Sequence, residues 1–202
     1  MANVNSANAV TLKGSADIVS EFFNYGINSI LYQRGIYPPE SFTRLQKYGL
    51  TLLVTTNDKL QHYLSIVLKQ LREWLISKDV HRLVVVISNI DTKETLERWE
   101  FKIECDKDIK TNSKPKQKDI KEIQNEIKGV IRQITASVTF LPLLEVPCAF
   151  DLLIFMGKEA EVPNEWAESP PYLIPDSEEV QLRSFSTSIH KVDTAVTYKN
   201  TE

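Results

Sequence analysis

The sequence has few of the residues on which several protein classes depend. Only two cysteines, Cys105 and Cys148, occur in 202 residues, and a small disulfide-linked scaffold would need more. We therefore expect both thiols to be free, in a reducing compartment. The six glycines are scattered, so no glycine-rich loop can surround a phosphate. The longest aliphatic run, residues 83–87, is too short to cross a bilayer, and the N-terminal residues lack the apolar core of a signal peptide.

Motifs for catalysis and metal binding are missing as well. None of the three histidines has a cysteine, aspartate or glutamate at metal-ligand spacing, and no Gly-x-Ser-x-Gly sequence marks a nucleophilic serine. Ser188 and His190 are predicted on one face of a strand, but no acid is placed to orient them, so we interpret the pair as structural. The adjacent carboxylates of Glu178 and Glu179 are interpreted as part of a solvated loop. The sequence therefore favours a protein without catalytic residues, cofactor or metal.

Charge is unevenly distributed, although the whole chain carries only −3. Residues 107–121 hold six lysines and two aspartates, whereas residues 157–179 hold seven acidic residues and one lysine. The lysine-rich stretch has no aromatic residue for stacking on bases, and acidic residues follow it at once. We therefore predict a mobile, solvated loop over residues 107–118. Neither nucleic acid nor a membrane is an expected partner, because the chain has no net positive charge.

Three stretches carry apolar residues at the spacing of a helix face. The first can begin at Ser15, whose hydroxyl suits an N-cap, and it ends near Gly35. The second follows Asn57, and the third starts after the lysine-rich stretch and stops before Pro142. The stripe residues are Val19, Phe22, Phe23, Ile27 and Ile30; Leu60, Leu64, Val67, Leu68, Leu71 and Leu75; and Ile120, Ile123, Ile127, Val130, Ile131 and Ile134.

Strand patterns occupy much of the remaining chain. One predicted strand alternates so that Trp99, Phe101 and Ile103 share a face, and a turn at 91–93 joins it to the preceding strand as a hairpin. The mixed order of helices and tightly linked strands predicts an α+β fold, in which three helices pack on a mainly antiparallel sheet. The predicted strands are 82–90, 96–104, 146–155, 180–189 and 192–199.

A long connection separates the last hairpin from the strand before it. Residues 156–179 exceed the usual length of a loop inside a compact domain, and they contain Trp166, Tyr172, Leu173 and Ile174. Because strand patterns follow, the far end of this segment is anchored. The residues alone leave two interpretations open, a strap that closes over a bound chain and a surface loop that packs on its own domain.

Several segments resemble the HORMA-domain family, and within it the spindle assembly checkpoint proteins. The resemblance extends from Val10 to Tyr198. The segments that carry it are GSADIVSEFFNYGINSILYQRGIYPPESF (14–42), KYGLTLLVTT (47–56), LVVVISNI (83–90), LERWEFKIECD (96–106), VIRQITASVTFLPLLEVPCAFDLLIF (130–155) and RSFSTSIHKV (183–192).

The resemblance implies a peptide clamp with two folds and no enzymatic activity. In the open state the C-terminal hairpin covers a sheet edge. In the closed state it moves to the opposite side, and a partner's extended segment is trapped beneath a strap that the family calls the safety belt. The expected organisation is a single HORMA domain over 1–202, with a flexible tail (1–13), a core (14–156), and the safety belt with its mobile hairpin (157–199).

The implied role is to delay anaphase by holding protein partners. These partners are the anaphase-promoting-complex activator, a coiled-coil kinetochore receptor, another HORMA-fold regulator and an AAA+ remodelling ATPase. A homodimer of open and closed conformers is also implied. The implied locations are nucleus and cytoplasm, with kinetochore and spindle in mitosis.

The resemblance also assigns roles to individual residues. Arg132, Gln133 and Phe140 match a dimerisation patch on the third helix, and Trp74 is expected beside the clamp. Without the resemblance, we would interpret Arg132 as an ordinary exposed residue. For Trp74, a role as a core residue explains the sequence about as well as a place beside the clamp. The expected clamp residues also include Trp166, Tyr172, Val180, Leu182, Phe185, Ile189, Val192, Val196 and Tyr198.

Two other interpretations compete with a checkpoint clamp. One is another HORMA adaptor, such as the bridging subunit of a translesion polymerase or a meiotic axis protein. The other, from a different class, is a small hydrolase that uses His190. The hydrolase would need a pocket that excludes water around a pair of titratable groups with perturbed pKa values.

Overall fold

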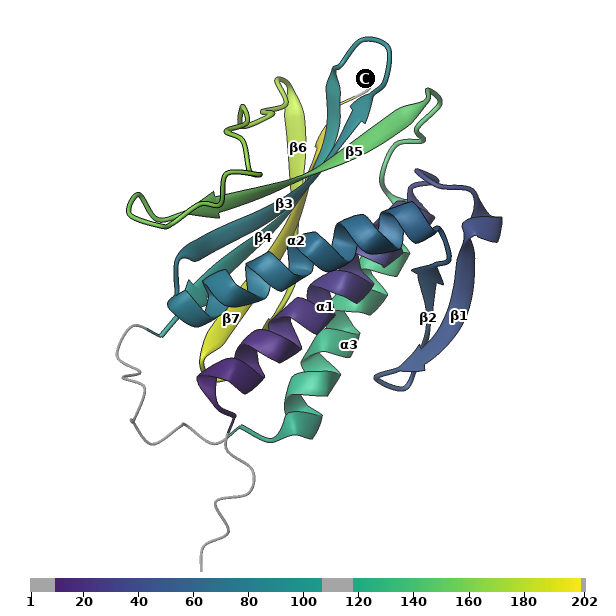
Figure 1. Cartoon of the computed structure of the whole chain (residues 1–202). Coiled ribbons are helices and arrows are strands. Elements are labelled where there is room, and N and C mark those ends of the chain that lie inside the picture. Colours follow the sequence, from purple (N-terminus) through teal and green to yellow (C-terminus); the bar gives the residue numbers. More distant parts are fainter. Residues whose placement is uncertain (1–9, 107–117, 201–202) are drawn as a thin grey trace, which may run out of the picture.

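In the computed structural model, three helices cover one face of a five-stranded antiparallel sheet (Figure 1). The structure describes residues 10–106 and 118–200, so most of the predicted lysine-rich loop lies outside the described residues. The arrangement confirms the predicted α+β class. No helix in the described part of the chain is long and apolar enough to span a membrane. The elements are α1 (Leu12–Gln33), β1 (Phe42–Lys47), β2 (Leu50–Thr55), α2 (Asp58–Ser77), β3 (Val80–Asn89), β4 (Thr95–Cys105), α3 (Ile120–Ala136), β5 (Cys148–Met156), β6 (Ser177–Ser186) and β7 (His190–Lys199).

Helix α1 begins earlier than predicted. Its N-cap is Thr11, whose hydroxyl accepts a hydrogen bond from the Gly14 amide at 3.0 Å. Ser15 therefore lies within the helix, where it is fully buried, and does not cap it. Val10 is also buried, so the ordered chain extends several residues beyond the predicted core boundary at residue 14. Sequence alone could not choose between the two hydroxyl residues, because each precedes a helical pattern.

Helices α2 and α3 begin where the sequence predicts. Asn57 caps α2 by accepting from the Leu60 amide at 3.1 Å, and Asp119 caps α3 by accepting from the Lys121 amide at 2.9 Å. Of all the predicted stripe residues, Ile120 alone is exposed, because it occupies the first position of α3. The stripes of the three helices meet the sheet and form the main hydrophobic core.

The strand order of the main sheet is β5-β3-β4-β7-β6, and every neighbouring pair is antiparallel. Alternate residues divide its two faces. On the inner face, Trp99 and Phe101 belong to the main core. The ring of Phe101 meets those of Phe22 and Phe23 edge-to-face, with centroids 5.8 and 5.4 Å apart. On the outer face, Val84, Val86 and Leu153 form a second, smaller cluster.

The hairpin β1–β2 was not predicted. It stands beside the helices, away from the main sheet (Figure 1). Its turn uses Tyr48 and Gly49, both at positive φ, as a tight hairpin requires. The hydrophobic pattern of the sequence did not predict these strands, because β1 is largely polar and only its residue Phe42 is buried.

Candidate functional site

The two edges of the main sheet differ in what lies beside them. Strand β5 forms one edge and β6 the other, so the C-terminal hairpin β6–β7 lies on the β4 side of the sheet. Strand β7 pairs with β4 along nine positions, from Glu97↔Tyr198 to Cys105↔His190. The hairpin is therefore an integral part of the sheet in this arrangement.

The edge of β5 has a strand partner on one side only. It pairs with β3, for instance Leu152 with Val85, and no described strand pairs with its other side. Aromatic rings lie at its first half, where Phe150 contacts Tyr37 and Tyr63 with ring centroids 6.2 and 6.1 Å apart. Burial and the carboxylate of Asp151 raise the pKa of Tyr63, so its hydroxyl stays protonated. An extended chain added at this edge could form hydrogen bonds with backbone groups of β5 and contact these aromatic rings.

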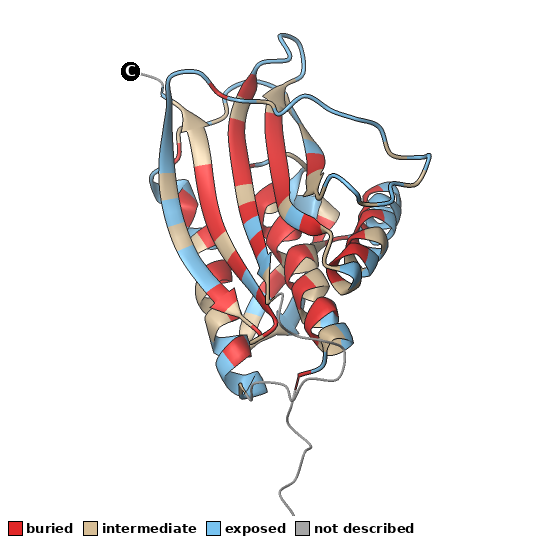
Figure 2. Ribbon diagram, turned by 90° about the vertical axis from the view of Figure 1, so that its left-hand side faces the viewer, coloured by how far each residue is buried: buried red, intermediate tan, exposed pale blue. Residues whose placement is uncertain are grey.

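The segment 157–176, which we call the strap, leaves the end of β5 and reaches β6 at the opposite edge (Figures 1 and 2). Its first half is fixed to α2 through Trp74. The indole Nε1–H of Trp74 donates to the Glu161 carbonyl at 3.1 Å, and its ring meets Trp166 edge-to-face with centroids 5.0 Å apart. Trp74 is buried and contacts two residues of the strap.

The second half of the strap covers the outer face of the sheet. Tyr172 packs against the outer cluster around Val84 and Leu153, and Ile174 is buried. At the end of the strap, the Asn200 amide donates to the Asp176 carbonyl at 3.0 Å, which joins the strap to the last residues of β7. Most other strap residues are exposed (Figure 2). The strap therefore has two attachments, one at Trp74 and one at the C-terminal hairpin.

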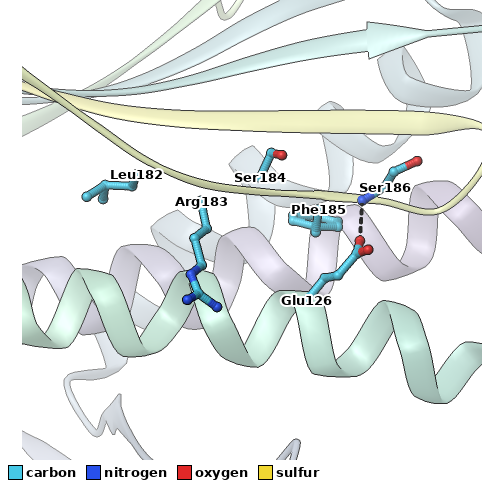
Figure 3. Close-up of a pocket in the computed structure, with 6 residues that line it drawn as sticks. All are labelled: Glu126, Leu182, Arg183, Ser184, Phe185 and Ser186. Carbon is cyan, nitrogen blue, oxygen red and sulfur yellow. Dashed lines mark hydrogen bonds between the residues drawn. The ribbon is translucent and has the colours of Figure 1, made fainter.

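The edge of β6, in contrast, is capped at two of its amides by side chains of α3. The Ser186 amide donates to the Glu126 carboxylate at 2.9 Å (Figure 3). The Arg183 amide donates to the side-chain oxygen of Gln133. Lys118 in turn donates to both Glu126 oxygens at 2.7 Å. The Arg183 side chain also lies against Gly129 of α3. A cavity of about 480 Å³ lies between Glu126 and residues 182–186.

The predicted clamp residues on the hairpin divide into two groups. Phe185, Ile189, Val192 and Val196 are buried, and the ring of Phe185 lies 4.6 Å from that of Phe22. Val180, Leu182 and Tyr198 are half-buried and pack against the same core.

Two assignments made from the sequence at this hairpin were wrong. Glu178 and Glu179 lie on β6 and not in a loop, and Ser188 lies in the β6–β7 turn at φ 77° and not on a strand with His190.

The predicted dimer residues lie on and after α3. Arg132 is exposed, and Phe140 exposes 43% of its surface. Gln133 is half-buried, and its amide oxygen is engaged with the Arg183 amide inside the chain. Lys128, Arg132 and Arg183 line a shallow groove of about 550 Å³ beside the capped edge of β6.

His190 has no catalytic surroundings. It is buried, with Nδ1 2.7 Å from the Ser15 hydroxyl and Nε2 3.1 Å from the Leu75 carbonyl. Burial lowers the pKa of His190, which keeps the ring neutral at pH 7. The described residues contain no group of three potential metal ligands. Among the described residues, the hydrogen-bond partners of this ring are a hydroxyl and a backbone carbonyl, and no carboxylate is one of them.

The HORMA domain pattern matches residues 15–190, which is most of the chain. The chain belongs to the HORMA-domain family.

The HORMA relatives narrow the assignment further. The human mitotic spindle assembly checkpoint protein MAD2A is 64% identical over 190 residues, covering 94% of this chain and 93% of the relative. The MAD2A of Dictyostelium discoideum is 58% identical, over 98% of this chain and 97% of the relative. A chain in the crystal structure of a mitotic checkpoint complex is 45% identical, with a TM-score of 0.85, covering 93% of this chain and 99% of that one. Within the family, the chain therefore belongs with the spindle assembly checkpoint proteins rather than with the translesion or meiotic adaptors.

Some features of this HORMA site had no signal in the sequence. The α3 side chains that cap β6 lie 50 and 60 residues from the amides they accept. Ser15 lies 175 residues from His190. Such pairs become visible only when the topology is known, because no local pattern links them.

Proposed function

We propose that this spindle assembly checkpoint component is a peptide clamp that takes up an extended partner segment along the open edge of β5, beneath the strap. The observation that carries the proposal is the asymmetry of the sheet. One edge is capped by α3. The other has no strand partner within residues 10–106 and 118–200, and it is crossed by a strap that is attached at both ends.

An added strand suits this edge on physical grounds. It would satisfy backbone groups of β5 by forming a ladder, which provides affinity without much dependence on sequence. Specificity would come from side chains that meet Tyr63 and Phe150 at one end and Trp166 at the other. The strap then has to open before the ligand can leave, so dissociation would be slow.

The position of the hairpin β6–β7 fits the closed state of such a clamp. In the family's open state the hairpin covers the edge that a ligand uses, and here that edge is left open. Conversion would require β7 to separate from β4 and pair elsewhere. Two packings of one sequence that differ by a few kcal/mol are a known, although rare, kind of switch.

The partners that we propose are an extended segment of the anaphase-promoting-complex activator or of a coiled-coil kinetochore receptor. The similarity to a chain of a mitotic checkpoint complex supports protein partners of this kind. We propose that a HORMA-fold regulator, an AAA+ ATPase and a second copy of the chain act on the same protein. The role is that of an adaptor without catalysis, in nucleus and cytoplasm and at kinetochores in mitosis.

The strap is tested by comparing two substitutions in it. Trp166→Ala removes the ring contact with Trp74, whereas Leu173→Ala, a matched control, removes a side chain that is 70% exposed. A fluorescent peptide from the anaphase-promoting-complex activator is bound and then chased with unlabelled peptide. We expect dissociation to be about two- to tenfold faster for Trp166→Ala, since an aromatic pair contributes about 0.5–1.5 kcal/mol beyond its buried area and about 1.4 kcal/mol corresponds to a factor of ten. We expect little change for Leu173→Ala.

Hydrogen exchange locates the ligand. On peptide binding we expect new protection in β5 (148–156) and in the strap, with little change in β6. Protection confined to α3, or no binding at all, would show that the open edge is not the ligand site.

A further inference from the structure

A buried chain of hydroxyl and imidazole groups joins the turn of the C-terminal hairpin to two helices. Thr187 Oγ1 lies 2.5 Å from Ser15 Oγ, which lies 2.7 Å from His190 Nδ1. His190 Nε2 lies 3.1 Å from the Leu75 carbonyl oxygen at the end of α2. Ser15, Thr187 and His190 are all at most 1% exposed, so water does not compete for these bonds.

The positions of the protons follow from chemistry. A carbonyl oxygen can only accept, so His190 Nε2 carries a proton and donates it to Leu75. Nδ1 of the neutral ring then accepts from the Ser15 hydroxyl. The single hydroxyl proton of Thr187 goes to Ser15 Oγ at 2.5 Å, because its other acceptor, the His190 carbonyl oxygen, is farther away at 3.3 Å. Thr187 Oγ1 also accepts from the amides of Ile189 and His190, at 3.2 and 2.9 Å. Every side chain in this hydrogen-bonded series therefore has a partner, and all the bonds point in one direction. Breaking one bond would leave a buried polar group without a partner, which costs free energy.

These hydrogen bonds depend on the position of the hairpin β6–β7. Thr187 and His190 flank the tight turn between β6 and β7, and His190 is the first residue of β7. Ser15 belongs to the first turns of α1, and Leu75 to the last turn of α2. The bonds to Ser15 and Leu75 exist only while the hairpin turn sits beside these two helices, with β7 paired to β4.

We propose that Thr187, Ser15 and His190 form a latch that selects the conformer in which the hairpin β6–β7 pairs with β4. These are positioning residues, since none of them lies at the open edge of β5. The inference rests on the proposed function, because the latch acts on the clamp by holding the far attachment of the strap. When the hairpin leaves β4, all three side chains must find other partners, so the latch adds a barrier as well as stability.

The latch is tested with Ser15→Ala and Thr187→Val, which delete hydroxyls and keep the shape of the core. Hydrogen exchange of the free full-length chain is compared with that of the wild type. We expect exchange of the amides in 177–199 to become at least about tenfold faster, because a buried nitrogen or hydroxyl loses its partner. We expect β3 and β5 to remain protected.

Two controls separate a latch from a general loss of stability. Ser137→Ala removes an equally buried hydroxyl, which donates to the Ile134 carbonyl at 2.6 Å on α3, so it should lower the melting temperature without a selective effect on 177–199. Thr194→Val alters a buried β7 hydroxyl that has no partner, and it should leave the hairpin as protected as before. Equal acceleration of exchange throughout the chain in Ser15→Ala would overturn the proposal, as would an unchanged hairpin.

A second measurement distinguishes the latch from the clamp. Dissociation of the fluorescent peptide described above should also be at least about tenfold faster in Ser15→Ala, because the strap loses the support of its far end. A loosened hairpin together with unchanged peptide dissociation would support the latch and contradict the clamp. A peptide that never binds the wild type would contradict the clamp alone, and the exchange result would still decide the latch.

Discussion

The two edges of the main sheet show opposite solutions to one physical problem. An edge strand presents unpaired backbone groups to any extended chain that passes. At β6, the side chains of Glu126 and Gln133 accept hydrogen bonds from outward amides, and α3 covers the edge. At β5, aromatic rings and a strap surround the edge but no strand completes it.

Under the proposed function, this difference has a direct interpretation. A protein that protects one edge with dedicated side chains has the means to protect the other, so the proposal assigns the open edge under the strap to a partner. Asp151 is consistent with this interpretation, because an exposed charge on β5 discourages unspecific pairing without blocking a single chosen strand.

Removal of the hairpin's last strand should have the largest effect. Deleting residues 193–202 takes away most of β7, including the fully buried Val196 and Thr194. The strap then loses its attachment through Asn200, and β4 becomes an edge. We expect tight binding of the peptide to be abolished. The free energy of unfolding should fall by several kcal/mol, at about 2–5 kcal/mol for each large buried side chain that is removed.

The cost to stability follows from the position of β7 in the sheet. A terminal strand could detach at little cost if it lay at an edge, but β7 lies between β4 and β6. A thermal melt and a peptide-binding curve on the same sample separate the two effects. A folded, truncated protein that holds the peptide as tightly as the full chain would rule out the clamp.

The exposed face of α3 beside the capped edge is expected to contact a second copy of the chain. Arg132 projects from α3 next to the groove that Lys128 and Arg183 also line. Arg132→Glu should weaken self-association by about 2 kcal/mol or more, as for a central interface arginine, and Arg132→Ala by less. Stability of the single chain should change by less than about 0.5 kcal/mol, because the residue is exposed. Analytical ultracentrifugation measures the first quantity and a denaturant melt the second; an unchanged dimer would refute the assignment.

The cap on β6 can be removed without touching the other edge. The double change Glu126→Ala and Gln133→Ala deprives the Ser186 and Arg183 amides of their acceptors and Lys118 of its main carboxylate. We expect a loss of about 1–2 kcal/mol in unfolding free energy, since each lost bond contributes about 0.5–1.5 kcal/mol. Glu122→Ala is the matched control, because that carboxylate is 61% exposed and stands 3.9 Å from Lys118. Equal melting curves for the double variant and the control would mean that the cap adds nothing.

Much of the fold was predictable because it depends on local periodicity. The stripes of the three helices and the alternation around Trp99 and Phe101 identify the faces that are buried. The hairpin β1–β2 was missed because its first strand buries only Phe42, so the pattern of a half-buried strand is absent. The start of α1 was misplaced because Thr11 and Ser15 are equally good caps by residue type.

The candidate site was predictable only in part. The length of the strap and the aromatic residues within it marked it as unusual, and resemblance to the family supplied its role. The cap on β6 and the contacts of His190 could not be found, because each joins residues that are far apart in the chain. Glu178 and Glu179 were placed in a loop because acidic residues are depleted in strands, yet β6 is an exposed edge that accepts them.

The smallest expected effect is a pH dependence that belongs to the hairpin and not to the open edge. Burial lowers the pKa of His190, and the ammonium group of Lys78 lowers it further, while the hydrogen bond with the Leu75 carbonyl raises it. The thiol of Cys105, which faces His190 in the β4–β7 register, has a pKa raised by burial and stays neutral.

Because the pKa of His190 is lowered, protonation of this ring is less favourable in the folded chain than in the unfolded chain, where the pKa is near 6.5. The unfolded chain binds more protons between that value and the lower pKa of the folded chain, so stability is full above about pH 6.5 and falls as the pH drops through this window. The loss of stability from this one group is at most about 1.4 kcal/mol per pH unit.

The test compares the unfolding free energies of the wild type and of His190→Gln between pH 7.5 and 5.5. The difference isolates the contribution of His190, because the substituted chain keeps every other titratable group. The wild type should lose more stability than the variant across this range, and hydrogen exchange should rise first in 177–199; equal slopes for the two proteins would show that His190 is not held neutral by its surroundings.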